Sequence, residues 1–247
     1  MPAAPSLTRR DVEGPRGLVL MLHGGKADGS TPVDDRSASW RRSNWMLGHI
    51  AERVNDAGAG IWLLRYSIRG WNAGTASPPS PVPDARWALQ EVRRAFGDLP
   101  VVLLGHSMGG RTAVAVADDP HVVGAVALAA WLPPDEPVDT LRGKHLASAH
   151  GRRDRITSAR QDAAFCRRAA EVAASTEFVD IGPVGHYMFR RRRAWNDFAA
   201  SRSLKFLGLD RGGRRGSDAA SEWSRGEGSH SDAASESRRS RPTGEAQ

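Results

Sequence analysis

A serine framed by glycines, between a short apolar run and a helical segment, limits the possible folds of this chain more than any other feature. Residues 101–104 are apolar, two of them are β-branched, and together they predict a buried strand. A sharp turn follows at Gly105 and Gly109 with Ser107 at its apex, and residues 111–117 predict a packed helix. Such a turn leaves no room for a neighbouring Cβ and turns the serine hydroxyl away from the backbone.

The rest of the chain alternates apolar runs with amphipathic segments. Continuous apolar runs are typical of strands covered on both faces, and alternating strands and helices predict a mainly parallel sheet with helices on both faces. We therefore expect an α/β fold with about six or more strands. The expected strands are residues 18–22, 61–66, 101–104, 122–130, 145–149 and 176–181, and the expected helices are 45–55, 84–96, 111–117, 158–174 and 189–206.

The two ends of the chain differ in composition from the middle. Residues 1–17 are rich in proline and polar residues and predict an irregular lead-in to an α/β domain over residues 18–210. Residues 211–247 consist mainly of glycine, serine, arginine and acidic residues, and the hexapeptide SDAASE occurs there twice. Trp223 is the single large apolar side chain of that segment, which predicts a disordered low-complexity tail.

Composition narrows the class of protein. Apolar residues make up 40% of the 247 residues, which allows one sizeable domain. The formal net charge is +7, but the arginines are scattered, so we interpret them as surface charge and expect no nucleic-acid partner. The single cysteine, Cys166, excludes an intramolecular disulfide. Without a signal-peptide core or an apolar run near 18 residues, we expect a cytoplasmic protein with no membrane span.

Three loops that follow predicted strands carry the residue types that acyl transfer needs. Their order along the chain is Ser107, Asp154 and His186, and loops at the carboxyl ends of parallel strands meet at one edge of a sheet. A serine hydroxyl requires a base, and histidine, with an unperturbed pKa of about 6.5, suits that task at neutral pH. Asp154 is the predicted orienting acid, and Asp135 and Asp139 in the preceding loop are the alternatives.

The Gly-His-Ser-Met-Gly-Gly sequence resembles the nucleophile elbow of the α/β-hydrolase superfamily, and the resemblance covers about residues 18–207. It implies that Ser107 is the nucleophile, His186 the base and Asp154 the acid, in the chain order of that fold. That superfamily usually begins with an additional antiparallel pair of strands. Since only about 17 residues precede the first clear strand, we expect this pair to be reduced or absent.

The resemblance also implies an oxyanion hole and an open site. The backbone N–H groups of Met108 and Gly25 are the expected donors, with Lys26 as the alternative second donor. Relatives often insert a helical cap where residues 131–143 form only a short loop, so we expect no large cap domain. The candidate substrate-binding residues are Lys26, Tyr66, Trp71 and Trp131, together with the loop at 26–43.

The resulting hypothesis is a serine hydrolase that cleaves a small carboxylic ester or thioester through an acyl-enzyme, without a cofactor or a metal. An amidase or an acyltransferase would use the same groups, and a non-catalytic scaffold of the same fold is the alternative from another class. The arginines at 190–193 favour anionic substrates if they face the site, and otherwise provide ordinary surface charge. The sequence leaves the oligomeric state open.

Overall fold

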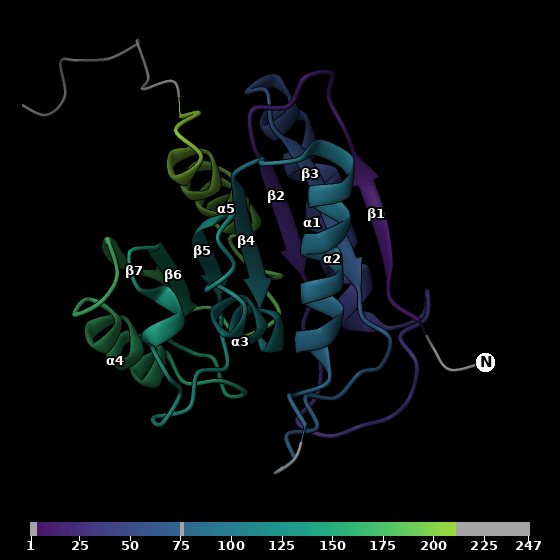
Figure 1. Ribbon diagram of the computed structural model, residues 1–247. Helices are drawn as coiled ribbons and strands as arrows, with labels where there is room; N and C mark the ends of the chain where they lie inside the picture. Colours follow the sequence, from purple (N-terminus) through teal and green to yellow (C-terminus); the bar gives the residue numbers. More distant parts are fainter. Residues whose placement is uncertain (1–3, 75–76, 211–247) are drawn as a thin grey trace, which may run out of the picture. The chain divides into compact units, whose positions relative to one another are not determined.

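Seven strands form one sheet in the order β1-β3-β2-β4-β5-β6-β7 (Figure 1). The structure is a computed structural model that describes residues 4–74 and 77–210, so the prediction for the tail at 211–247 lies outside the described residues. The strands are β1 (Ser6–Arg10), β2 (Leu18–Leu22), β3 (Gly60–Arg65), β4 (Val101–His106), β5 (Val122–Leu128), β6 (His145–Gly151) and β7 (Ser175–Gly182). The helices are α1 (Ala38–Asp56), α2 (Pro81–Phe96), α3 (Met108–Ala115), α4 (Ala159–Ala169) and α5 (Arg192–Phe206), with a short 3-10 turn at Asp139–Leu141.

The N-terminal segment contains an edge strand, so the prediction of an irregular lead-in over residues 1–17 was wrong for part of its length. β1 pairs antiparallel with β3, with Ser6 opposite Arg65 and Arg10 opposite Ile61. No residue of β1 is fully buried, and the strand is specified by backbone pairing rather than by an apolar face. The additional antiparallel part of the sheet is therefore reduced to this one strand.

The remaining six strands are parallel and form the centre of the core. Every residue of β2 and β4 is buried, as expected for strands covered on both faces. The helix α1 packs beside α5, and α2 packs beside α3. Right-handed crossovers place α1 and α2 on opposite faces, because the chain moves in opposite directions along the sheet through them. Figure 1 shows α2 and α3 together in front of the sheet.

The helix α1 begins at Ala38, seven residues before its predicted start. Trp40 and Ser43 continue the buried stripe formed by Leu47, Ile50 and Val54, so the helical face extends toward the N-terminus. The loop after β2 is correspondingly shorter, and the first turns of α1 come to lie near the carboxyl ends of the strands. Among the described residues, no helix combines the length and the apolar character that crossing a bilayer requires.

The neighbouring strands β2 and β4 form the switch point of the sheet. The connection after β2 leads to β3 on one side, and the connection after β4 leads to β5 on the other. Ligands of open α/β sheets bind in the crevice outside the carboxyl ends of such a strand pair. The segment 23–25 follows β2 and Ser107 follows β4, so both lie at this crevice.

The turn after β4 packs directly against the end of β2. A Cβ on Gly109 would lie 2.1 Å from the carbonyl oxygen of Leu22 and 2.7 Å from that of His23. No side chain fits at that distance from backbone atoms, so glycine at this position allows α3 to begin immediately beside β2.

We expect Gly109→Ala to lower the free energy of unfolding by about 2 kcal/mol or more, because the added methyl group meets backbone atoms that cannot rotate away. Gly48→Ala on α1 is the matched control, since a Cβ there meets nothing within 4 Å. It should raise the free energy of unfolding by about 0.5–1 kcal/mol through helix propensity. Urea denaturation followed by circular dichroism measures both values, and unchanged stability of Gly109→Ala would contradict the proposed packing.

Candidate active site

Ser107 sits at a strained position between β4 and α3. Its φ is 56°, a left-handed value that is uncommon for a residue other than glycine and costs about 1–3 kcal/mol. Its backbone N–H donates to the carbonyl of Leu128 at 3.0 Å, and its own carbonyl accepts the N–H of Gly110 at 3.0 Å. These bonds hold the turn in place, and Ser107 immediately precedes α3 without a capping hydrogen bond from its side chain.

Three of the predicted site residues form one continuous chain of hydrogen bonds. The Ser107 Oγ lies 3.0 Å from the Nε2 of His186, and the Nδ1 of His186 lies 2.8 Å from the Oδ2 of Asp154. Ser107 and His186 are buried, and the Asp154 side chain has no exposed surface. An imidazole with one nitrogen on a carboxylate and the other on a hydroxyl is arranged to take the hydroxyl proton.

The loops that carry Asp154 and His186 are joined by their backbones. The N–H of Arg152 donates to Gly182 at 2.9 Å, and the N–H of Arg153 donates to Val184 at 3.1 Å. A Cβ on Gly151 would lie 2.2 Å from the carbonyl oxygen of Val184, so only glycine permits this close approach. The two alternative acids, Asp135 and Asp139, are exposed.

Hydrogen bonds keep the Asp154 carboxylate ionised although it is buried. Burial by itself would raise the pKa of this carboxyl, but hydrogen bonds from His150 and His186 outweigh it. The backbone N–H groups of Ile156 and Thr157 also donate to Oδ1, at 2.8 and 3.0 Å. Together these donors hold the pKa of Asp154 far below its usual range.

A second histidine lies behind Asp154 in the interior of the domain. The Nε2 of His150 is 3.2 Å from the Oδ2 of Asp154, and its Nδ1 is 2.7 Å from the Oδ2 of Asp162 on α4. The hydroxyl of Ser148 donates to Asp162 at 2.8 Å. Burial by itself would lower the pKa of His150, but its bonds to the two carboxylates raise it to about 9. His150 is therefore a cation between two acids at neutral pH.

Sequence reasoning missed this buried pair. Neither His150 nor Asp162 was identified from the sequence as a residue of the site. A signal was present, because Ser148 and His150 alternate with alanines along a buried strand and thus share one face of it. The partner across that face lies on α4, and the identity of such a partner depends on packing rather than on local sequence.

Two further histidines hold the surrounding loops and remain neutral. Burial lowers the pKa of His106 to about 3, and its Nε2 donates to the carbonyl of His186 at 3.1 Å. Burial likewise lowers the pKa of His23 to about 4. Its Nδ1 donates to the carbonyl of Gly24 at 2.6 Å, and its Nε2 accepts the N–H of Tyr66 at 3.2 Å. His106 thus braces the loop of His186, and His23 braces the loop after β2.

The structure distinguishes between Gly25 and Lys26, the two candidates for the second backbone donor near Ser107. The N–H of Lys26 donates to the carbonyl of Arg69 at 2.9 Å and is therefore engaged. Within residues 4–74 and 77–210, the N–H groups of Gly25 and Met108 donate no hydrogen bond. Of the two alternatives for the second donor, Gly25 is the one with a free N–H group.

Two pockets open on Ser107, and they share Gly25 and Ile156 in their linings. The first has a volume of about 370 Å³ and is lined by Gly24, Gly25, Ala38, Ser39, Arg42, His106, Ser107, Ile156, His186, Tyr187 and Phe189. The second has a volume of about 430 Å³ and is lined by Gly25, Lys26, Ala27, Ser107, Met108, Trp131, Ile156 and Thr157. The loop after β2, which was predicted to line the site, therefore supplies only part of the lining. The first turn of α1 and the segment after His186 supply other parts.

The four candidate substrate-binding residues separate into two pairs. Lys26 and Trp131 line the second pocket. Tyr66 and Trp71 are buried and line neither pocket, which differs from the prediction. Tyr66 packs on His23 beneath the loop after β2, and Trp71 packs edge to face behind Trp131. Because both side chains are buried, they contact His23 and Trp131 rather than the pockets themselves.

Comparison with known proteins identifies related sequences and folds. The family described as "Alpha/beta hydrolase family" matches residues 19–237 of the chain. No curated protein shows significant similarity to the sequence.

Several solved structures share the fold at low sequence identity. An esterase 2 from Thermogutta terrifontis, phosphonylated by cyclosarin, is 15% identical with a TM-score of 0.62, over 83% of this chain and 90% of that chain. Est1E from Butyrivibrio proteoclasticus, with bound ferulic acid, is 12% identical with a TM-score of 0.59, over 83% and 96%. An alpha-beta serine hydrolase homologue from Coxiella burnetii is 15% identical with a TM-score of 0.58, over 80% and 90%.

The buried cation at His150 gives a testable dependence of stability on pH. Its pKa is raised to about 9 in the folded chain, from about 6.5 when unfolded, so the stabilisation is complete below about pH 6.5 and is lost as the pH rises through 9. We expect His150→Gln to lower the free energy of unfolding by about 3 kcal/mol at pH 6, because Asp162 loses its charged partner. The difference from wild type should shrink by about pH 9.5.

Urea denaturation at the two pH values measures this effect. His49→Gln on the exposed face of α1 is the control and should change stability by less than about 0.5 kcal/mol. A difference between wild type and His150→Gln that does not change with pH would show that His150 is not charged in the folded chain.

Proposed function

The chain belongs to the α/β-hydrolase family, and we propose that it is a serine hydrolase that cleaves a carboxylic ester or thioester through an acyl-enzyme. The proposal is carried by the chain of hydrogen bonds from the Ser107 hydroxyl through His186 to Asp154. These residues come from three separate loops. A purely structural serine turn has no need of an oriented imidazole and a fully buried carboxylate beside it.

In the first step the Ser107 Oγ attacks the carbonyl carbon of the substrate, and its proton passes to the Nε2 of His186. The new carbon–oxygen bond converts the carbonyl oxygen into an oxyanion. Asp154 accepts a hydrogen bond from the other nitrogen of the ring and stabilises the imidazolium that forms. Because its hydrogen-bond donors keep Asp154 ionised, this stabilisation is available over the whole neutral range.

The oxyanion requires donors on the side of Ser107 away from His186. We assign this role to the N–H groups of Gly25 and Met108, which are unengaged in residues 4–74 and 77–210 and line the second pocket beside Ser107. Met108 is the first residue of α3, so the positive end of the helix dipole adds to the field at this point. Losing one such donor typically costs about 2.7–4 kcal/mol of barrier.

In the second half of the reaction the tetrahedral intermediate collapses and the bond to the leaving group breaks. The proton held on His186 Nε2 is transferred to the departing oxygen or sulfur. A water molecule then gives a proton to the same nitrogen and attacks the acyl carbon. The bond between that carbon and Oγ breaks, and His186 returns the proton to Oγ, which releases the acid and restores the Ser107 hydroxyl. An amine leaving group or an alcohol in place of water would follow the same path. The site is open, so we propose a small-molecule substrate.

We expect Ser107→Ala to lower kcat/KM for 4-nitrophenyl acetate by about 10⁴-fold or more, because no other group can form the acyl-enzyme. It should also abolish labelling by a fluorophosphonate. The Thermogutta esterase structure is described as phosphonylated by cyclosarin. Ser201→Ala on α5 is the matched control and should retain both activities. Folded wild-type protein that neither reacts nor hydrolyses the ester would support the scaffold alternative.

We expect Asp154→Asn to lower kcat by about 10³- to 10⁴-fold, because the amide favours the wrong tautomer of His186. Asp135→Asn and Asp139→Asn replace the two exposed alternatives with the same change of charge and should leave kcat within about twofold of wild type. Steady-state kinetics with one activated ester compares the three variants. A large loss in either control would move the role of the acid to the loop after β5.

A further inference from the structure

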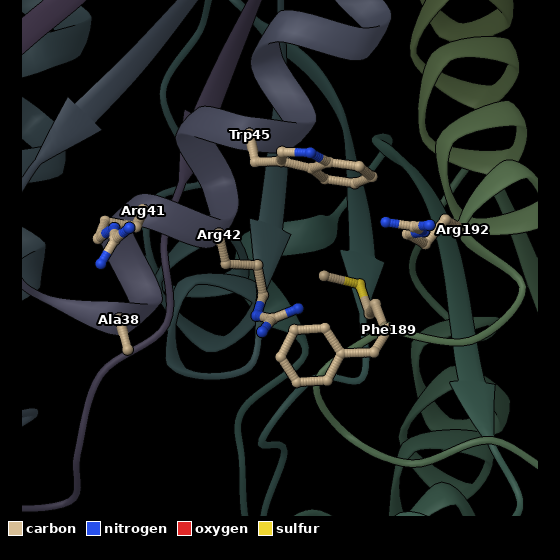
Figure 2. Close-up of a pocket in the computed structure, with 7 residues that line it drawn as sticks. Ala38, Arg41, Arg42, Trp45, Phe189 and Arg192 are labelled. Carbon is tan, nitrogen blue, oxygen red and sulfur yellow. The ribbon is translucent and has the colours of Figure 1, made fainter.

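A third pocket continues from the one that contains His186. It has a volume of about 360 Å³ and lies between the first turns of α1 and the segment that leads into α5 (Figure 2). It shares Ala38, Arg42 and Phe189 with the pocket at Ser107, so the two are contiguous. Its full lining is Ala38, Arg41, Arg42, Trp45, Met188, Phe189 and Arg192.

This pocket is positively charged and contains no acid. Arg41, Arg42 and Arg192 line it, and neither it nor the adjoining pocket has an aspartate or glutamate in its lining. Among the described residues, no carboxylate lies within 4.0 Å of these three guanidinium groups. By contrast, Arg111 and Arg202 elsewhere on the domain each pair with a glutamate at 2.6 Å.

Aromatic rings hold two of these arginines at the pocket. The guanidinium of Arg42 lies 4.1 Å from the ring centre of Phe189 and 5.3 Å from that of Tyr187. The guanidinium of Arg192 lies 5.4 Å from the ring of Trp45. Figure 2 shows Arg42 beside Phe189, with Arg192 across the pocket. Stacking on aromatic rings orients a guanidinium while its N–H donors stay available for a planar or tetrahedral anion.

The large apolar side chains that remain exposed on the described part of the domain gather at these pockets. They are Trp45 at 38% exposed, Ile156 at 57%, Tyr187 at 52% and Phe189 at 70%. Contiguous exposed apolar surface marks a binding site. The combination of an apolar rim with unneutralised arginines fits a ligand that has an apolar or aromatic body and a negative charge at its end.

The chemistry of the proposed reaction tells which part of the substrate lies on this side. His186 must deliver its proton to the leaving atom, so the leaving group has to lie next to His186. His186 lines the pocket that continues toward Arg42, and it does not line the pocket formed by Lys26, Met108 and Trp131. The leaving group therefore extends toward the arginines, and the acyl group lies on the side of Trp131.

We propose that the substrate carries an anionic group, a carboxylate or a phosphate, at the end of an apolar leaving group, and that Arg42 and Arg192 bind this anion. The inference rests on the proposed function, since it assigns the alcohol or thiol side of the ester cleaved at Ser107. Phe189 and Trp45 contact the apolar stem, and Arg41 adds to the positive field at the outer end of the pocket.

The test uses two esters that differ by one charge. (4-Acetoxyphenyl)acetate and its primary amide have the same acetyl group and a phenol leaving group. In each, a methylene joins the phenol ring to the end group, which is a carboxylate in the first ester and a neutral amide in the second. We expect wild-type kcat/KM to be about tenfold higher for the carboxylate, which corresponds to about 1.4 kcal/mol. This preference should weaken as the salt concentration rises, because the site is partly open to solvent. Equal values for the two esters in wild type would overturn the inference.

Substitutions of the pocket arginines test whether these residues cause the preference for the anionic ester. Arg42→Gln should lower the ratio of the two kcat/KM values by about fivefold to tenfold, and Arg192→Gln, which lies on a different helix, by about twofold to threefold. Arg10→Gln removes the same charge from β1, where Arg10 pairs with Ile61 at the amino end of β3, away from the carboxyl ends of the strands, and should keep the wild-type ratio. Ratios that are unchanged in both pocket variants would contradict the assignment.

Binding separates this inference from the proposed function. Calorimetry on Ser107→Ala with (4-hydroxyphenyl)acetate and its amide measures the charge preference without turnover. Preferred binding of the anion that requires Arg42, without hydrolysis by wild type, would overturn the proposed function and keep the anion site. Hydrolysis that requires Ser107 but shows no charge preference would overturn only the anion site. A third ester, (4-acetoxybenzyl)phosphonate, distinguishes a carboxylate site from a phosphate site, since a phosphate site should favour it over the carboxylate ester.

Discussion

The close contact between the turn after β4 and the end of β2 is the constraint on which the site depends. The missing side chain of Gly109 lets α3 begin against the carbonyl of Leu22, and the parallel register already places Leu22 beside Gly105. The loop after β2 and the apex of the turn after β4 are thereby forced together at the switch point of the sheet. The positive φ of Ser107 and the free backbone N–H of Met108 beside it both follow from this steric condition, because packing on both sides holds the strained backbone in place.

The second requirement is electrostatic, and it is met by alternating charges in the interior. Asp162, His150 and Asp154 form an acid–cation–acid series behind His186, and Ser148 and the backbone N–H groups at 156 and 157 satisfy the remaining carboxylate oxygens. An isolated buried carboxylate would take up a proton and lose its ability to stabilise an imidazolium. His150 prevents this for Asp154. His150 is also paired with Asp162, whose pKa burial raises, so one cation lies between two carboxyl groups and keeps Asp154 ionised next to His186.

The parts of this arrangement that follow from local patterns were predictable from the sequence, and the parts that follow from packing were not. The apolar runs identified six of the strands, and the glycines around Ser107 identified the turn, because both signals lie within a few neighbouring residues. β1 escaped because an exposed edge strand needs backbone partners rather than a buried face. The start of α1 was placed late because polar Ser43 and the loop-like residues before it concealed the buried stripe, and Asp162 escaped because its partner is on another element.

The late placement of α1 matters most for specificity, since Ala38, Arg41 and Arg42, which precede the predicted start of the helix, line the pocket between α1 and Phe189. A helix that begins at Ala38 carries Arg42 and Trp45 on adjacent turns, and the segment after His186 brings Phe189 and Arg192 opposite them. The groups for chemistry come from the strand ends, which the sheet topology fixes in place, whereas the groups for recognition come from a helix start and a loop that can vary without disturbing the sheet. Within the described residues the segment after β5 is short and forms no cap, so the positively charged side of the crevice remains open next to His186, which protonates the leaving group in the proposed reaction.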